Sequence, residues 1–255
     1  MAILKRLSIY TIISLLVILW CMGCTKTPKE SLPKGFVYLT DIDPTMVECA
    51  RYATPENFLG RVVPGYSTHK IVCTREAALA LKAVHADLNQ QGYTLVVYDA
   101  YRPQRSVDAF VKWADDLNDL TAKKLYYPTI DKKDLFRLDY IAGKSSHTRG
   151  STFDLGIIKT GDKLKAPLLT RRKLSNGEEV PFLDDNTVDM GSSFDLFHPV
   201  SNHDSSLVTE QQTKMRNVLR ETMKNHGFKE YQQEWWHYTL ANEPYPNIYF
   251  DFVVG

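Results

Sequence analysis

The amino-acid sequence predicts an α+β domain in which a small, mostly antiparallel central sheet is flanked by helices. Short apolar runs of strand length alternate with longer segments whose apolar residues recur at helical spacing. The helical segments also carry capping residues or end at glycine. With 44% hydrophobic and 24% charged residues, residues 35–255 are long enough to form one domain with a sizeable core.

The first elements lead toward a candidate catalytic arginine. A helix is expected over residues 76–91, because one face is apolar and Gly92 follows it as a terminator. Residues 93–98 form an apolar strand that leads to Arg102. Helical spacing returns over residues 106–117, so a second helix is expected there.

The later elements carry most of the candidate site. The apolar run at residues 153–158 predicts a buried strand. Thr209 and Gln212 form a capping box ahead of a helix that closes at Gly227. A further strand is expected over residues 235–240.

The polar segment at residues 159–189 is expected to be a surface hairpin or loop. Its basic cluster at residues 171–173 lies among polar residues, so a solvated loop is favoured over a phosphate-binding surface. The formal net charge of the chain is +1, which gives no general attraction to polyanions. The sequence therefore predicts no nucleic-acid partner.

Three short segments, far apart in the chain, contain the side chains of a zinc hydrolase. Catalytic zinc usually has three protein ligands and one open position, and His147, Asp154 and His237 match that number. A base must take a proton from the attacking water and deliver it to the leaving amine, which we expect of Glu234. Arg102 is expected to stabilise the negative charge that develops on the carbonyl oxygen.

The spacing of these residues requires two irregularities of the backbone. His147 and Asp154 are seven residues apart, and an odd separation on a continuous strand sends side chains to opposite faces. The chain must therefore bend between them, and Gly150 can adopt backbone conformations closed to other residues. Glu234 and His237 are three apart, which requires a helical turn, a bulge or a strand end.

Further motifs are distributed over residues 36–255. They are Arg-Tyr-Ala-Thr-Pro at 51–55, Pro-Gly-Tyr at 64–66, Tyr-Arg-Pro at 101–103, Ser-Ser-His at 145–147, Ser-Phe-Asp at 193–195, Glu-Trp-Trp-His-Tyr at 234–238 and Glu-Pro-Tyr-Pro-Asn at 243–247. Together they resemble the D-alanyl-D-alanine dipeptidases, a branch of the zinc peptidases that cut D-Ala bonds. The histidine-containing segments alone would indicate only the wider group that includes D,D-carboxypeptidases and L,D-endopeptidases.

The resemblance implies the zinc fold that D-Ala-D-Ala peptidases share with hedgehog proteins, which agrees with the predicted α+β class. It also implies hydrolysis of D-Ala-D-Ala to two D-alanines. One zinc ion would be bound by His147, Asp154 and His237. Glu234 would be the general base, and Arg102 would stabilise the tetrahedral intermediate.

The resemblance further implies which residues bind the two ends of the substrate. Asp195 and Tyr52 would receive the ammonium group, and Ser145, Ser146 and Tyr66 would lie around the carboxylate. A free dipeptide is a compact zwitterion, so both of its charged ends need partners in an enclosed pocket. A longer peptide lacks the ammonium at that point, so it would leave the buried Asp195 carboxylate unpaired.

Two other functions remain open at this stage. The same zinc site could serve a D,D-carboxypeptidase that acts on peptidoglycan stem peptides. The chain could also be a zinc-containing binding lipoprotein without turnover. The presence of both Glu234 and Arg102 argues against the second alternative, because a purely structural metal needs neither a base nor an oxyanion partner.

The N-terminal residues predict an exported protein. Residues 1–23 have a basic start and an apolar stretch at 7–20, which is shorter than the ~20 residues that comfortably span a bilayer. This pattern is typical of a signal peptide, although an uncleaved anchor is an alternative with the same topology. The sequence around Cys24 resembles a bacterial lipoprotein site, so Cys24 is expected to carry lipid and to anchor the protein to a membrane. The polar residues 24–34 are expected to be a flexible tether ahead of a catalytic domain at 35–255.

Two cysteines remain within the expected catalytic domain. Cys49 and Cys73 could form a disulfide in an oxidising compartment. The alternative is a pair of buried free thiols. Neither is expected to be a nucleophile, because the metal site already supplies one.

Overall fold

The structure is a computed structural model that describes residues 32–255. The expected signal peptide, Cys24 and most of the expected tether lie outside these residues. Within residues 32–255, no helix is both long and apolar enough to cross a bilayer.

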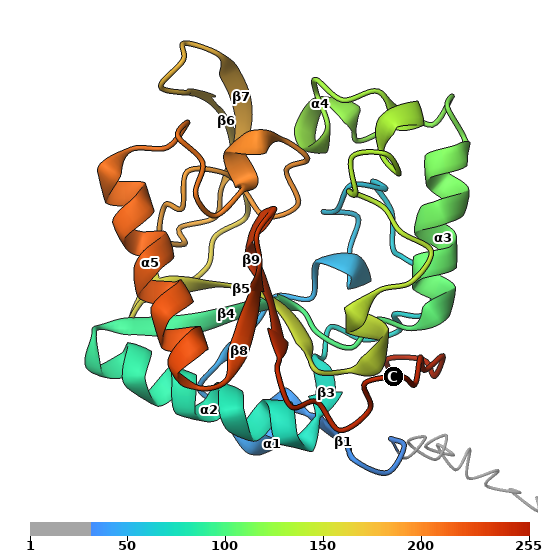
Figure 1. Ribbon diagram of the computed structural model, residues 1–255, viewed down its shortest axis with the longest axis vertical. Coiled ribbons are helices and arrows are strands. Elements are labelled where there is room, and N and C mark those ends of the chain that lie inside the picture. The colour runs from blue at the N-terminus through green and yellow to red at the C-terminus, as the bar shows by residue number, and fades with distance from the viewer. Residues whose placement is uncertain (1–31) are drawn as a thin grey trace, which may run out of the picture. The chain divides into compact units, whose positions relative to one another are not determined.

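A five-stranded sheet occupies the centre of the fold (Figure 1). Its strands, in spatial order, are β2 (Val47–Glu48), β4 (Tyr93–Asp99), β5 (Thr152–Lys159), β9 (Glu234–Leu240) and β8 (Phe228–Tyr231). The short β2 pairs with β4 in parallel, and the other neighbours pair antiparallel. This confirms the expected α+β class with a small, mostly antiparallel sheet.

Two long helices pack against the sheet and against each other. These are α2 (Arg75–Gln90), which contacts β4, and α5 (Glu210–Asn225), which contacts β8 and β9. Both lie on the same side of the strands in Figure 1. The capping box of Thr209 and Gln212 is present at the start of α5. Gly92 and Gly227 follow the two helices with positive φ, as glycines that end helices commonly do.

The remaining helices are short, apart from one that flanks the candidate site. That helix is α3 (Gln104–Asp115), which begins two residues before the predicted start. Its N-terminal cap is Pro103, whose carbonyl oxygen accepts hydrogen bonds from the backbone N–H groups of Ser106 and Val107. The short helices and 3₁₀ turns are α1 (Leu39–Ile42), α4 (Lys123–Tyr126), η1 (Arg51–Ala53), η2 (Lys132–Asp134), η3 (Ser146–Arg149) and η4 (Pro199–Ser201).

Two small sheets lie apart from the central one. β1 (Phe36–Tyr38) pairs with β3 (Val72–Thr74), and β6 (Leu168–Lys173) pairs with β7 (Glu179–Asp184). The second pair is a hairpin that projects at the top of Figure 1. It confirms that the polar segment at residues 159–189 contains a surface hairpin.

Cys49 and Cys73 are both free thiols, so the disulfide considered from the sequence is not formed. Cys73 lies on β3 in the main hydrophobic core, where burial raises the pKa of its thiol. Cys49 is partly buried and follows β2. The alternative of free cysteines is therefore the observed state.

Candidate active site

A cavity of about 230 Å³ brings the predicted site residues together. Its walls include all the predicted metal ligands, the predicted base, the predicted oxyanion residue and four of the five predicted substrate contacts, the exception being Tyr66. The residues are Tyr52, Arg102, Ser145, Ser146, His147, Asp154, Asp195, Glu234 and His237.

The three predicted metal ligands form a compact triangle. Oδ1 of Asp154 lies 3.3 Å from Nε2 of His147 and 3.2 Å from Nδ1 of His237, and these two nitrogens are 3.3 Å apart. Ligands of a tetrahedral zinc ion, with bonds of about 2.0–2.1 Å, are separated by roughly 3.3 Å. Oδ1 of Asp154 is buried and has no hydrogen-bond partner. The donor set, its spacing and this unpaired oxygen all fit a zinc ion.

The backbone brings the ligands together through a turn and a strand pairing. His147 lies in η3, and Gly150 ends that turn with φ of +86°. A side chain at Gly150 would collide with the ring of Phe36. The chain then enters β5, where Asp154 lies directly opposite His237 of β9. The predicted bend between His147 and Asp154 is therefore confirmed.

An irregularity in β9 places Glu234 beside the metal ligands. Between the pairs Glu230–Tyr238 and Tyr231–Glu234, the register of β8 and β9 shifts. This shift lets Glu234 and His237 share a face, as their spacing required. Oε2 of Glu234 lies 3.2 Å from Nδ1 of His237, at the edge of the ligand triangle.

Hydrogen bonds on the far side of each imidazole orient the two histidines. Nδ1 of His147 lies 2.8 Å from the carbonyl oxygen of Ala100, so it is the protonated nitrogen and Nε2 is free to bind a metal. Nε2 of His237 lies 3.3 Å from Oγ of Ser146, which leaves Nδ1 facing the triangle. Burial lowers the pKa of His237, but the carboxylates of Asp154 and Glu234 outweigh it and raise that pKa to about 9.

Arg102 is held between two carboxylates at the cavity wall. Its Nη2 lies 2.8 Å from Oδ2 of Asp99 and 3.2 Å from Oδ2 of Asp154. The guanidinium also lies 4.8 Å from the ring centre of Tyr52. Tyr66 donates its hydroxyl to Oδ1 of Asp99 at 2.7 Å, so it lies behind Arg102 and outside the set of cavity-lining residues. This position favours an indirect role for Tyr66 over the predicted substrate contact.

Asp99 is a site residue that was not assigned from the sequence. Its side chain is 1% exposed, and it contacts Tyr66 and Arg102 and lies 3.4 Å from Nδ1 of His147. The sequence feature that could have indicated its role is its position at the end of an apolar strand, three residues before Arg102. A carboxylate at that point can reach Arg102, but its proximity to His147 is visible only in the folded structure.

Asp195 is the second buried carboxylate of the cavity. Its Oδ2 accepts a hydrogen bond from the hydroxyl of Tyr52 at 2.8 Å. Burial raises the pKa of Asp195 well above its usual range, and the nearby charge of Asp154 adds to this effect. Its φ of +60° is in the left-handed region that non-glycine residues rarely adopt. An ionised carboxylate buried in this environment is stabilised when a cation accompanies it.

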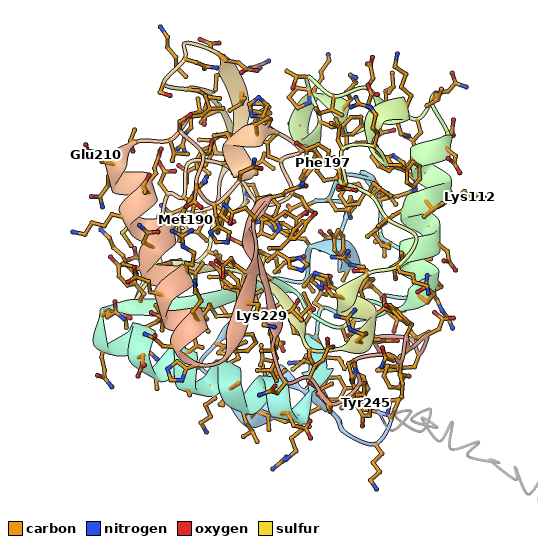
Figure 2. The ribbon with its side chains drawn as sticks, viewed as in Figure 1. Lys112, Met190, Phe197, Glu210, Lys229 and Tyr245 are labelled. Atoms are coloured by element: carbon orange, nitrogen blue, oxygen red, sulfur yellow. The ribbon has the colours of Figure 1, made fainter. Side chains whose placement is uncertain are left out.

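Apolar and aromatic side chains form most of the remaining cavity wall, which also includes the charged residues Asp139 and Lys144. The apolar and aromatic residues come from α3, the segment after η1 and the loops at residues 139–146 and 195–197, and include Phe58, Val107, Phe110, Tyr140, Ile141 and Phe197. Figure 2 shows Phe197 on the α3 side of β9 and Met190 on the α5 side. This wall was not recognisable in the sequence, because its residues have the composition of any core.

Ser145 and Ser146 both lie at the cavity, as predicted. Ser145 is the N-terminal cap of η3, and its Oγ accepts a hydrogen bond from the backbone N–H of His147 at 3.3 Å. The Ser146 hydroxyl contacts His237. Both serines therefore support the metal ligands as well as lining the cavity.

Comparisons with known proteins identify the family of the chain. A family profile described as D-ala-D-ala dipeptidase matches residues 33–166 and 182–255. The D-alanyl-D-alanine dipeptidase of Enterococcus faecium is 40% identical over 220 residues, which cover 86% of this chain and 98% of the relative. The one of Enterococcus faecalis is 37% identical over 224 residues, covering 88% and 100%. The one of Streptomyces coelicolor is 37% identical over 206 residues, covering 81% and 91%. The chain therefore belongs to the D-ala-D-ala dipeptidase family of metal-dependent peptidases.

Proposed function

We propose that this protein hydrolyses the free dipeptide D-Ala-D-Ala to two molecules of D-alanine, with one zinc ion bound by His147, Asp154 and His237. The observation that carries the proposal is one small cavity that holds the ligand triangle, Glu234 and the buried carboxylate of Asp195 together. Such a cavity suits a small substrate that has both a scissile amide and a free ammonium group.

The catalytic residues divide the work between proton transfer and charge stabilisation. A bound zinc ion supplies a Lewis acid and lowers the pKa of water at the site. Glu234, at the edge of the ligand triangle, accepts the proton of the attacking water and donates it to the leaving amine. Arg102, fixed by Asp99, stabilises the negative charge on the former carbonyl oxygen.

The remaining polar groups select the substrate by its ends. Asp195 and Tyr52 receive the ammonium, while Ser145 and Ser146 lie around the carboxylate. A substrate with a blocked amine leaves Asp195 buried without a cation, which costs free energy that the free dipeptide does not incur. This favours the dipeptidase over the D,D-carboxypeptidase alternative.

The function is tested with the purified full-length protein and a small substrate panel. Zinc-loaded protein is incubated with D-Ala-D-Ala or with N-acetyl-D-Ala-D-Ala, and D-alanine is quantified with and without a chelator. Zinc-dependent release from the free dipeptide alone is expected. Faster release from the blocked peptide would instead support a carboxypeptidase, and binding without release would support a non-catalytic lipoprotein.

We also propose that the protein is exported and held at a membrane by lipid on Cys24. Support comes from the basic start, the apolar stretch and the cysteine of the N-terminal residues. In cells labelled with a fatty-acid analogue, the wild type is expected to carry label and to sediment with membranes, whereas Cys24→Ser is expected to lose the label. Recovery of unlabelled wild-type protein in the cytosol would contradict the proposed export and membrane attachment.

A further inference from the structure

The position of Asp195 is set partly from outside the cavity. We propose that Arg51 and Asp185, which form a buried ion pair behind the cavity wall, are positioning residues that orient Tyr52 and Asp195 for the ammonium group of the substrate. This inference rests on the proposed dipeptidase function.

The ion pair and the ammonium site share one turn of the chain. Nη2 of Arg51 lies 2.6 Å from Oδ2 of Asp185, and the two side chains are only 8% and 7% exposed. Tyr52, the next residue in η1, donates its hydroxyl to Asp195. Consecutive residues of a single turn therefore hold two carboxylates, one inside the cavity and one behind it. A rotation of η1 that broke the ion pair would also move the Tyr52 hydroxyl.

A second set of contacts leads from Arg51 to Asp195 through aromatic rings. The Arg51 guanidinium lies 5.6 Å from the ring centre of Tyr98, and Tyr98 stacks on Phe194 at 4.7 Å between ring centres. Phe194 directly precedes Asp195. A separate small cavity of about 20 Å³ adjoins Arg51, Tyr98, Asp185 and Phe194, which is room for roughly one water molecule. The ion pair is therefore nearly enclosed.

The β6–β7 hairpin contacts the loop that carries Asp195. The backbone N–H of Leu183 on β7 donates to Oγ of Ser193 at 2.7 Å. Leu174 and Val180 of the hairpin form a small hydrophobic cluster with Leu196 and Val200. Contacts from the hairpin therefore reach the chain on both sides of Asp195. The family match omits residues 167–181, which include Leu174 and Val180, whereas Leu183 and Ser193 lie within the matched residues.

The conformation of Asp195 explains why its loop needs the contacts from the ion pair and the hairpin. A non-glycine residue at positive φ is strained and persists only where its surroundings hold it. Loss of the ion pair would let the loop relax toward an ordinary conformation and move the Asp195 carboxylate away from Tyr52. The expected damage is to recognition of the substrate amine, because neither Arg51 nor Asp185 lines the catalytic cavity.

The structure offers a matched control for this inference. Arg51 has a second carboxylate partner, Glu56, at 2.6 Å, but the Glu56 side chain is 52% exposed. Asp185→Asn and Glu56→Gln each remove one negative charge from the same guanidinium. Of the two carboxylates, only Asp185, which directly follows β7, connects that guanidinium to the hairpin.

The experiment measures kcat and KM for D-Ala-D-Ala and for N-propionyl-D-alanine, the analogue without the amine, with full-length zinc-loaded protein. For Asp185→Asn, KM for the dipeptide is expected to rise about tenfold or more, with kcat nearly unchanged. The preference for the dipeptide over the analogue is expected to fall by a similar factor. Glu56→Gln is expected to behave as wild type, and Asp185→Glu is expected to recover part of the preference.

Folding is followed by thermal melting of each variant. Should Asp185→Asn fail to fold, Arg51→Lys provides the same test, because lysine keeps the charge but not the planar set of donors. Folded variants with wild-type KM and wild-type preference would overturn the inference while leaving the dipeptidase proposal intact. If the wild type releases no D-alanine, the proposed function fails instead. Calorimetric binding of D-Ala-D-Ala to wild type and Asp185→Asn then decides whether the ion pair orients the site.

Discussion

One carboxylate oxygen of Asp99 lies 2.9 Å from Nε and 2.8 Å from Nη2 of Arg102. The same side chain accepts a hydrogen bond from Tyr66 and approaches His147. Asp99 therefore connects the predicted oxyanion residue to a predicted metal ligand without lining the cavity itself. A change at Asp99 should disturb both.

Asp99→Asn is expected to lower kcat/KM for the dipeptide by roughly 10–100-fold, the usual effect of losing a residue that orients a metal ligand. The neutral amide no longer offers Arg102 a charged partner, so the guanidinium shifts. Steady-state kinetics together with zinc content measure the effect. Unaltered activity would show that Arg102 needs no support from Asp99.

Glu234→Gln is expected to lower kcat by roughly 10²–10⁴-fold, because the amide cannot accept a proton. Metal content should stay at the wild-type value, since the ligand triangle consists of other residues. Metal analysis of the purified variant is the control. Loss of the metal would identify Glu234 as a ligand and not the base.

Asp195→Asn is expected to stabilise the fold at neutral pH while raising KM for the dipeptide. Burial raises the pKa of Asp195, so the folded state binds this proton more tightly than the unfolded state, and stability falls as pH rises above about 4. The asparagine variant lacks this penalty. Melting curves should show a higher melting temperature than wild type at pH 7 and convergence near pH 4. A lower melting temperature of the variant at pH 7 would contradict this account.

Binding of zinc at pH 7 is expected to release about one proton from His237, whose pKa in the metal-free site is raised to about 9. In the metal-free protein, the stabilisation from the protonated imidazole is complete below about pH 6.5 and is lost as pH rises through about 9. Calorimetric titrations in buffers of different ionisation enthalpy count the protons. Binding enthalpies independent of the buffer would refute proton release.

Gly150→Ala is expected to destabilise the protein by at least about 1–2 kcal/mol, because a left-handed conformation is costly for residues with a Cβ atom. The added methyl group would also meet Phe36. The turn between His147 and Asp154 would shift, so zinc affinity should fall as well. Gly161→Ala is a suitable control, since that glycine also has positive φ but has open space around it. Denaturant unfolding and zinc titration of both variants measure the difference.

The elements with strong periodicity were predictable from the sequence. The capping box of α5, the glycine after α2 and the apolar runs of β4 and β5 depend on neighbouring residues, and the structure confirms each. The metal triangle was predictable because few residue types bind zinc. The need for a bend at Gly150 followed from the alternation of side chains along a strand.

Other features depend on contacts between distant segments. The pairing of Arg51 with Asp185 joins residues 134 positions apart, and no local pattern distinguishes these two charges from solvated ones. The aromatic wall of the cavity has the composition of an ordinary core. The hydrogen bond between Tyr66 and Asp99 depends on where a loop meets β4, which the motif alone does not show.

The strand β9, which carries Glu234 and His237, follows all the other strands that the structure describes in residues 32–255. Until β9 pairs with β5, the ligands His147 and Asp154 lack the third ligand, His237. A chain still emerging from the ribosome therefore cannot complete its metal centre. Consumption of D-Ala-D-Ala must wait until β9 has been synthesised, and truncation before β9 would leave a protein with neither base nor full ligand set.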